Sequence, residues 1–101
     1  MLIYNITIKV DWTIHEAWLQ WMVDTHIPAV HRTGCFNKHQ LVRLIEIDEN
    51  DGPTYALQLY AENKEDYDRY MQLYAPALNH TAAHLWNDDM ITFATLMKVV
   101  H

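Results

Sequence analysis

The sequence is poor in the residues that mark nucleotide-binding, disulfide-linked and nucleic-acid-binding proteins. It has only 2 glycines among 101 residues, which nearly excludes glycine-rich loops that cradle phosphates. Its single cysteine, Cys35, cannot form an internal disulfide, and this favours a reducing, cytoplasmic location. Only 7 lysines and arginines stand against 13 acidic residues. The resulting net charge of −6 argues against nucleic acid or an anionic membrane as a partner.

The chain also lacks a long apolar run. Its N-terminus, MLIYNITIKVD, is apolar but short, with neither a basic leader nor a small-residue cleavage site, so we expect no signal peptide and no membrane span. The length predicts one domain, residues 1–101. Half of the residues are hydrophobic, with 4 Trp and 6 Tyr, which is more than a small monomer readily buries. A homodimer interface is the simplest place for this surplus.

Hydrophobic periodicity predicts a strand and a helix in the first third of the chain. Residues 2–10 alternate between apolar and polar side chains, as a half-buried strand does. The spacing of Thr13 and Glu16 predicts a capping box at the start of a helix. The helix then carries one apolar stripe, formed by Ile14, Trp18, Trp21, Met22 and Thr25. Pro28 predicts the end of this helix or a kink, and Gly34 suits its C-terminal exit.

The rest of the sequence predicts three strands and a second helical region. Residues 40–48 and 54–61 have strand character, and the Asn-Asp-Gly-Pro turn between them predicts a hairpin. Asn63 is a candidate N-cap, and Pro76 is expected to divide the following region into two helical pieces. The buried stripe of this region is formed by Tyr67, Tyr70, Met71, Tyr74 and Leu78. Residues 90–100 predict the last strand.

The predicted order is therefore strand–helix–strand–strand–helix–strand. Right-handed crossovers put both helical regions on one face of a four-stranded antiparallel sheet, which is the ferredoxin-like α+β fold. If Tyr4, Ile6 and Ile8 face the helices, the other face carries the polar side chains of the first strand. A mixed polar and apolar face of this kind suits a second subunit laid over it.

The run WLQWMVDTHIPAVHRTGCF, residues 18–36, together with the leading LIYNITIKVD, resembles a bacterial family of proteins of about 100 residues known only as a domain of unknown function. That family is similar to the dimeric α+β barrel superfamily, in which two ferredoxin-like subunits pack sheet to sheet. The resemblance spans nearly the whole chain and implies this fold and a homodimer. Superfamily relatives include cofactor-free monooxygenases, haem-degrading enzymes, isomerases and proteins of no known activity, so the resemblance does not fix a function.

One histidine and six other residues are the candidates for a functional site. His26 lies late in the first helix, where an imidazole can serve as a catalytic acid or base. The alternative is a helix-end histidine that bonds to a terminal carbonyl. The candidates for binding a planar aromatic ligand are Trp18, Trp21, Met22, Tyr67 and Tyr70, with Arg43 for an acidic group. Helical spacing makes most of these aromatic residues equally suited to the core, and Arg43 could pair with Glu46 or Asp48.

Two further clusters lack a complete chemical set. His80 and His84 have helical i, i+4 spacing, but two ligands are too few for a metal site, and we predict neither a metal nor a cofactor. His31 and His39 flank Cys35, which we expect to be a buried apolar side chain rather than a nucleophile.

Three hypotheses for function follow, in this order. The first is a homodimeric module that binds a small molecule or a partner without chemistry of its own. The second is a cofactor-free enzyme, similar to a monooxygenase or isomerase, that acts on a small aromatic substrate with His26 as acid or base. The third is haem or metal binding through a histidine.

Overall fold

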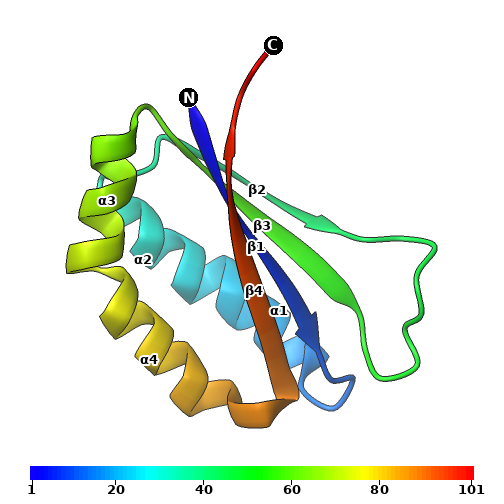
Figure 1. The fold of residues 1–101 in the computed structure, drawn as a ribbon. Helices are drawn as coiled ribbons and strands as arrows, with labels where there is room; N and C mark the ends of the chain where they lie inside the picture. The colour runs from blue at the N-terminus through cyan, green and yellow to red at the C-terminus, as the bar shows by residue number, and fades with distance from the viewer.

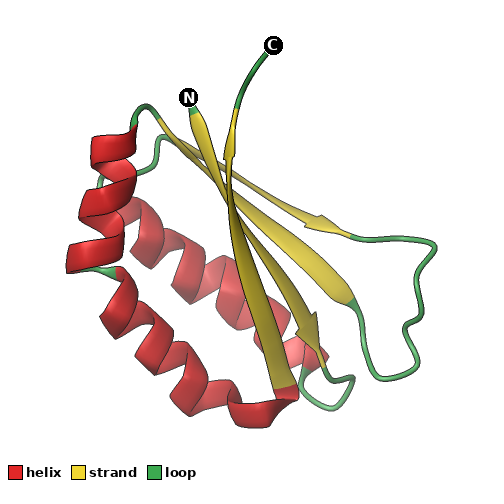
Figure 2. Cartoon of the chain, in the orientation of Figure 1, coloured by secondary structure: helices red, strands yellow, loops and turns green.

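The structure, a computed structural model, describes residues 1–101. The elements follow in the order β1 (Leu2–Val10), α1 (His15–Trp21), η1 (Met22–His26), α2 (Ile27–Arg32), β2 (Lys38–Arg43), β3 (Thr54–Ala61), α3 (Lys64–Leu73), α4 (Ala75–Trp86), η2 (Asn87–Asp89) and β4 (Met90–Lys98). The four strands form one antiparallel sheet in the order β2-β3-β1-β4. All helices lie on one face of the sheet, and the other face is uncovered (Figures 1 and 2). This confirms the ferredoxin-like α+β fold.

Strand β1 lies at the centre of the sheet and fixes which side chains face the helices. Tyr4, Ile6 and Ile8 line the space between sheet and helices together with Leu57 and Leu59 of β3. The predicted orientation of β1 is therefore confirmed. On the opposite face, the register places Asn5 beside Gln58 and Thr7 beside Ala56. The most completely buried large side chains of the core include Val10, Trp18, Val30, Leu57 and Leu59.

The first helical region contains a one-turn π-helix at its centre. In η1 the backbone N–H of Ile27 donates to the carbonyl of Met22, five residues earlier. Pro28 has no N–H to donate to residue 24, as a regular α-helix would require, and the wider turn accommodates its ring. The interruption expected at Pro28 takes the form of this π-turn, and the chain stays helical to Arg32.

The π-turn keeps the buried residues of this region on one side. These are Trp18, Met22, Ile27 and Val30, all less than about 5% exposed. In a regular α-helix the five-residue step from Met22 to Ile27 would rotate the side chain by roughly 140°. The one extra residue in the turn absorbs this rotation. Thr25, which was expected in the buried stripe, is exposed.

The predicted capping box at the start of the first helix is wrong. The first helix begins at His15 after Ile14, and no side chain caps it. Thr13 instead directs its backbone N–H and hydroxyl to the Asp11 carboxylate, both at 2.8 Å, so the capping box with Glu16 does not form. In a capping box the Thr13 N–H would donate to the Glu16 carboxylate, and here the Asp11 carboxylate, only two residues away, accepts that N–H instead.

Strand β2 is shorter and earlier than the predicted 40–48. It ends at Arg43, and Glu46 takes a positive φ of 58°, which no strand residue adopts. Arg43 pairs with Tyr55, and β3 begins only one residue earlier, at Thr54 after Pro53, so the residues that follow Arg43 have no strand to pair with. Arg43 folds back along this loop and pairs with Glu49 through three hydrogen bonds of 3.1–3.2 Å.

The second half of the chain agrees more closely with prediction. β3 has the predicted bounds, and the hairpin to β2 is antiparallel. The Asn63 carboxamide oxygen accepts a hydrogen bond of 2.9 Å from the Asp66 N–H and caps α3. The helical region divides before Pro76, which lies in the first turn of α4. Gly34 has a φ of +73° just after α2, as its expected role at the helix exit requires. No helix of the fold combines the length and apolar character needed to cross a bilayer.

Candidate functional site

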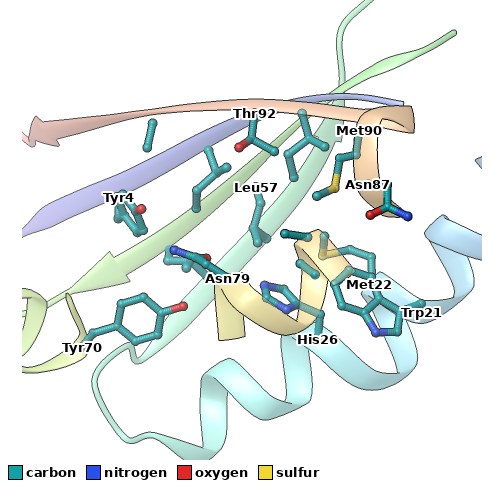
Figure 3. Close-up of a pocket in the computed structure, with 16 residues that line it drawn as sticks. Tyr4, Trp21, Met22, His26, Leu57, Tyr70, Asn79, Asn87, Met90 and Thr92 are labelled. Carbon is teal, nitrogen blue, oxygen red and sulfur yellow. The ribbon is translucent and has the colours of Figure 1, made fainter. Parts of the chain in front are cut away.

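A cavity of about 360 Å³ lies between the helices and the inner face of the sheet (Figure 3). Twelve of its 16 lining residues are hydrophobic. The lining consists of Tyr4, Ile6, Ile8, Trp21, Met22, His26, Leu57, Leu59, Tyr70, Asn79, Ala82, Ala83, Asn87, Met90, Thr92 and Ala94. This volume and this composition are typical of a site for a small organic molecule.

The π-turn of the first helical region builds one wall of the cavity. Trp21 and His26 are five residues apart, and on a regular α-helix they would point roughly 140° away from each other. Through η1 their rings come together, with 4.9 Å between centroids and 31° between planes. Trp86 of α4 meets the far side of Trp21 edge-on at 5.7 Å. Single π-turns inside α-helices occur often at functional sites.

Burial in the cavity wall favours the neutral form of the His26 imidazole. Burial lowers the pKa of His26 below its ordinary value, because the charged form loses its hydration. None of the 16 lining residues is an aspartate or glutamate that would restore the charge. A neutral imidazole offers one ring nitrogen as an acceptor and the other as a donor. His26, which lines the cavity, can therefore act as a hydrogen-bond donor through one ring nitrogen and as an acceptor through the other.

Two tyrosine hydroxyls reach the cavity from the opposite end. Burial raises the pKa of Tyr70 well above its usual range. The pKa of Tyr4 is also raised, first by burial and then by the nearby Tyr67 phenol. Both phenols are therefore protonated, and each can donate or accept a hydrogen bond. The Tyr70 ring is fixed by edge-on contact with Phe36 at 4.8 Å.

The remaining polar groups come from the last quarter of the chain. Asn79 projects from α4 between Tyr70 and His26, whereas Asn87 lies near Trp21 and Met90 (Figure 3). Asn87 combines a φ of 48° with a ψ of −131°, a positive-φ conformation outside the left-handed helical region. These residues were not among the sequence candidates. The positive φ required at the end of α4 is the one signal that could have singled out Asn87.

The cavity brings together four of the seven candidate residues from the sequence: Trp21, Met22, His26 and Tyr70. The others lie elsewhere. Trp18 is completely buried in the core beside Tyr55, with ring centroids 5.1 Å apart. Tyr67 meets Tyr4 edge-on behind the cavity wall. Arg43 is on the far edge strand, paired with Glu49.

The other histidines do not form a metal centre. No group of three or more histidine, cysteine, aspartate or glutamate side chains is arranged to hold a metal ion. His31 Nε2 and His39 Nδ1 form a pair at 2.6 Å on the surface. Cys35 between them in sequence is 2% exposed, as predicted for a buried thiol. His80 and His84 lie on the exposed side of α4.

Solved structures share the whole fold at low sequence identity. A dimeric ferredoxin-like protein from an uncultured marine organism has a TM-score of 0.78 and 10% identity, over 99% of this chain and 95% of that one. SnoaB, a cofactor-independent oxygenase from Streptomyces nogalater, has a TM-score of 0.68 and 13% identity, over 99% and 94%. The haem degrader MhuD from Mycobacterium tuberculosis, with two haems in its active site, has 0.67 and 19%, over 100% and 97%.

These similarities place the chain in the fold of dimeric α+β barrel proteins, and at such identities they show the fold alone. No protein of curated function matches the chain in sequence. The sequence does match a family model described as a domain of unknown function, DUF4286, over residues 1–100, and the chain therefore belongs to that family.

Proposed function

We propose that this protein is a cytoplasmic homodimer that binds a small, largely apolar organic molecule in the cavity beside His26. The single observation that carries the proposal is the cavity itself. It combines about 360 Å³ of space with apolar walls and a few convergent polar groups, the pattern of small-molecule sites. Its volume lies near the lower end of the usual range, which suits a ligand of two or three fused rings.

The ligand site depends on aromatic residues that hold each other in place. The Trp21 ring packs against His26 on one side and Trp86 on the other. Small residues of α4 and β4, namely Ala82, Ala83 and Ala94, leave the space that larger side chains would fill. Since most of the wall is built from rigid helices and the sheet, little ordering is needed on binding.

The uncovered face of the sheet supports the homodimer. On this face Ile91 and Phe93 of β4 are 66% and 65% exposed. Large apolar side chains gathered on one face mark an interaction surface. A protein of the same fold is described as dimeric, and in a two-fold dimer the same patch covers itself. The second subunit is therefore the partner that we assign to this face.

A polar row crosses the same face and would set the register of the two subunits. The strand pairings place Gln40 beside Gln58, Gln58 beside Asn5, and Asn5 beside Thr95. All four side chains lie on the uncovered face and span the sheet from one edge to the other. Amides that become buried in an interface need hydrogen-bond partners, so only alignments that pair the two rows are favourable.

Native mass spectrometry of protein purified from its own host tests this proposal. Gentle conditions are expected to show a dimer that carries a reproducible non-covalent small molecule, and denaturing conditions are expected to release it. The cavity-filling variant Ala82→Leu should lose the ligand, and Ala77→Leu, an exposed position on the same helix, should retain it. A dimer that carries no small molecule under gentle conditions would contradict binding in the cavity. So would equal retention of the ligand by the two variants.

A second candidate function is catalysis on the bound molecule without a cofactor. The observation that favours it is the position of the His26 imidazole in the wall of the cavity, where a ring nitrogen can accept a proton from a bound ligand. In this case His26→Ala abolishes turnover of the ligand identified above while the dimer persists. His26→Ala that retains full turnover would leave binding as the function.

A further inference from the structure

The cavity carries no fixed charge, although the chain as a whole is strongly acidic. None of the 16 lining residues is an aspartate, glutamate, lysine or arginine. The three titratable groups that face it, His26, Tyr4 and Tyr70, are each shifted by burial toward their neutral forms. With a net charge of −6 outside and neutral walls inside, the cavity is distinguished by its electroneutrality.

The closed part of this cavity, around the buried residues Met22, Leu57 and Tyr70, disfavours ions. A carboxylate or ammonium group that enters it loses hydration and meets no opposite charge, which is costly. Neutral polar groups lose less, because the hydroxyl of Tyr70 and the amide of Asn79 can replace water as partners. The lining therefore favours an uncharged ligand.

His26 further specifies what the ligand must carry. The hydrogen bonds that histidines make within the chain involve His15, His31 and His39, and none involves His26. A neutral imidazole without a partner leaves one nitrogen lone pair available in the cavity. The Trp21 and His26 rings form a tilted stack, with 4.9 Å between centroids, and both line the cavity, so an aromatic ligand can pack against this pair.

We propose that the cavity selects an uncharged hydroxyaromatic molecule of two or three rings, whose hydroxyl donates a hydrogen bond to the imidazole of His26. This inference rests on the proposed function and adds the chemical class of the ligand. The amides of Asn79 and Asn87 stand toward opposite ends of the cavity and bind further carbonyl or hydroxyl groups of the same molecule (Figure 3).

Titration calorimetry at pH 7 with four naphthalene derivatives tests the proposal. The probes are naphthol, methoxynaphthalene, naphthoate and naphthylmethylammonium, which share one ring system and differ in charge or in the hydrogen-bond donor. Naphthol is expected to bind at least about tenfold more tightly than naphthoate or naphthylmethylammonium, because burying an unpaired charge costs binding free energy. It is expected to bind about five- to tenfold more tightly than methoxynaphthalene, the effect of one hydrogen bond.

Variants of His26 separate the hydrogen bond from the shape of the cavity. His26→Phe keeps a flat ring and should remove the preference for naphthol over methoxynaphthalene. His26→Gln retains an acceptor and should keep the preference, which also covers the case in which His26→Phe fails to fold. His84→Phe, at an exposed position on α4, is the matched control and should leave all four affinities unchanged.

The outcomes distinguish this inference from the proposed function. Binding of naphthoate or naphthylmethylammonium as tightly as naphthol would overturn the inference and leave the cavity a binding site. An unchanged naphthol preference in His26→Phe would likewise overturn the role of His26. No binding of any of the four probes would overturn the proposed function and the inference together.

Discussion

Replacing Phe93 with lysine tests the proposed homodimer on the uncovered face of the sheet. The Phe93 side chain is 65% exposed in the single chain. A phenylalanine offers roughly 200 Å² for burial, so a partner that covers the exposed part removes about 130 Å² from water. At about 25 cal/mol per Å² this stabilises the dimer by roughly 3 kcal/mol per ring, and a two-fold dimer contains the ring twice.

The substitution is therefore expected to weaken dimerisation by up to about 6 kcal/mol, or about four orders of magnitude in the dissociation constant. Side-chain ordering and imperfect pairing reduce such area estimates in interfaces, so we expect a loss of at least about two orders of magnitude. Leu73→Lys is the matched control. Leu73 is also 65% exposed, but it lies on α3, in the helical layer.

Sedimentation velocity over a concentration series, with far-ultraviolet circular dichroism for the fold, provides the assay. The unchanged protein and Leu73→Lys should sediment as dimers, whereas Phe93→Lys should sediment as a folded monomer. Phe93→Lys that stays dimeric at the concentrations at which the unchanged protein is dimeric would refute the reasoning. So would dissociation caused by Leu73→Lys, because it would place the interface in the helical layer.

Three further predictions concern the folded chain. Trp18→Ala should lower the free energy of unfolding in urea by about 3–5 kcal/mol, because the side chain is completely buried, and a loss below about 1 kcal/mol would contradict its place in the core. Asn63→Ala should lower the same quantity by about 1 kcal/mol through loss of the α3 cap, while Asn63→Ser should restore most of it; equal stability of all three proteins would contradict the cap. The folded-state pKa of His26 lies below its value in the unfolded chain, so the unfolded state takes up the proton first, and stability should fall as pH drops from about 7 through 6.5 and onward to the folded-state pKa. The only other titratable groups that face His26 in the cavity are Tyr4 and Tyr70, which do not ionise in this range. His26→Gln should remove this part of the pH dependence in denaturation measured at a series of pH values, and an unchanged profile would show that His26 is solvated.

The parts of the fold that the sequence predicted well are those in which local chemistry and burial agree. β3 lies between two hydrogen-bonded neighbours and is nearly all buried. Its continuous apolar sequence fits only such a central strand, and its bounds were predicted correctly. Asn63 and Gly34 act within one helical turn, where side-chain and backbone rules depend on few distant contacts.

The parts that were predicted poorly depend on contacts distant in sequence. Residues 44–48 alternate as a strand does, but the partner strand β3 begins only at Thr54, so they have no strand to pair with, and Ile45 is left 78% exposed. Thr13 has the spacing of a cap, but Asp11 competes for its hydroxyl. Such competition is decided by geometry, which periodicity does not contain.

The candidate site was predictable for the residues near the first helix and not for those near the end of the chain. His26 and Trp21 carry chemistry that the sequence makes visible, although their meeting depends on the π-turn. Met22 and Ile27 are both apolar, so the five-residue step between them was a signal of that turn in the sequence. Asn79 and the small residues of α4 enter the cavity only because α4 faces β1 and β4 across it, and their sequence pattern does not distinguish them from an ordinary helix.

The most direct test of the central claim is a two-dimensional NMR titration of the labelled protein with naphthol, which maps where the ligand binds. The account predicts the largest shifts at the His26 ring and at the side-chain amides of Asn79 and Asn87, with His80 and His84 unchanged. Shifts confined to the uncovered sheet face around Phe93, or spread without saturation over exposed residues, would contradict a ligand site between helices and sheet.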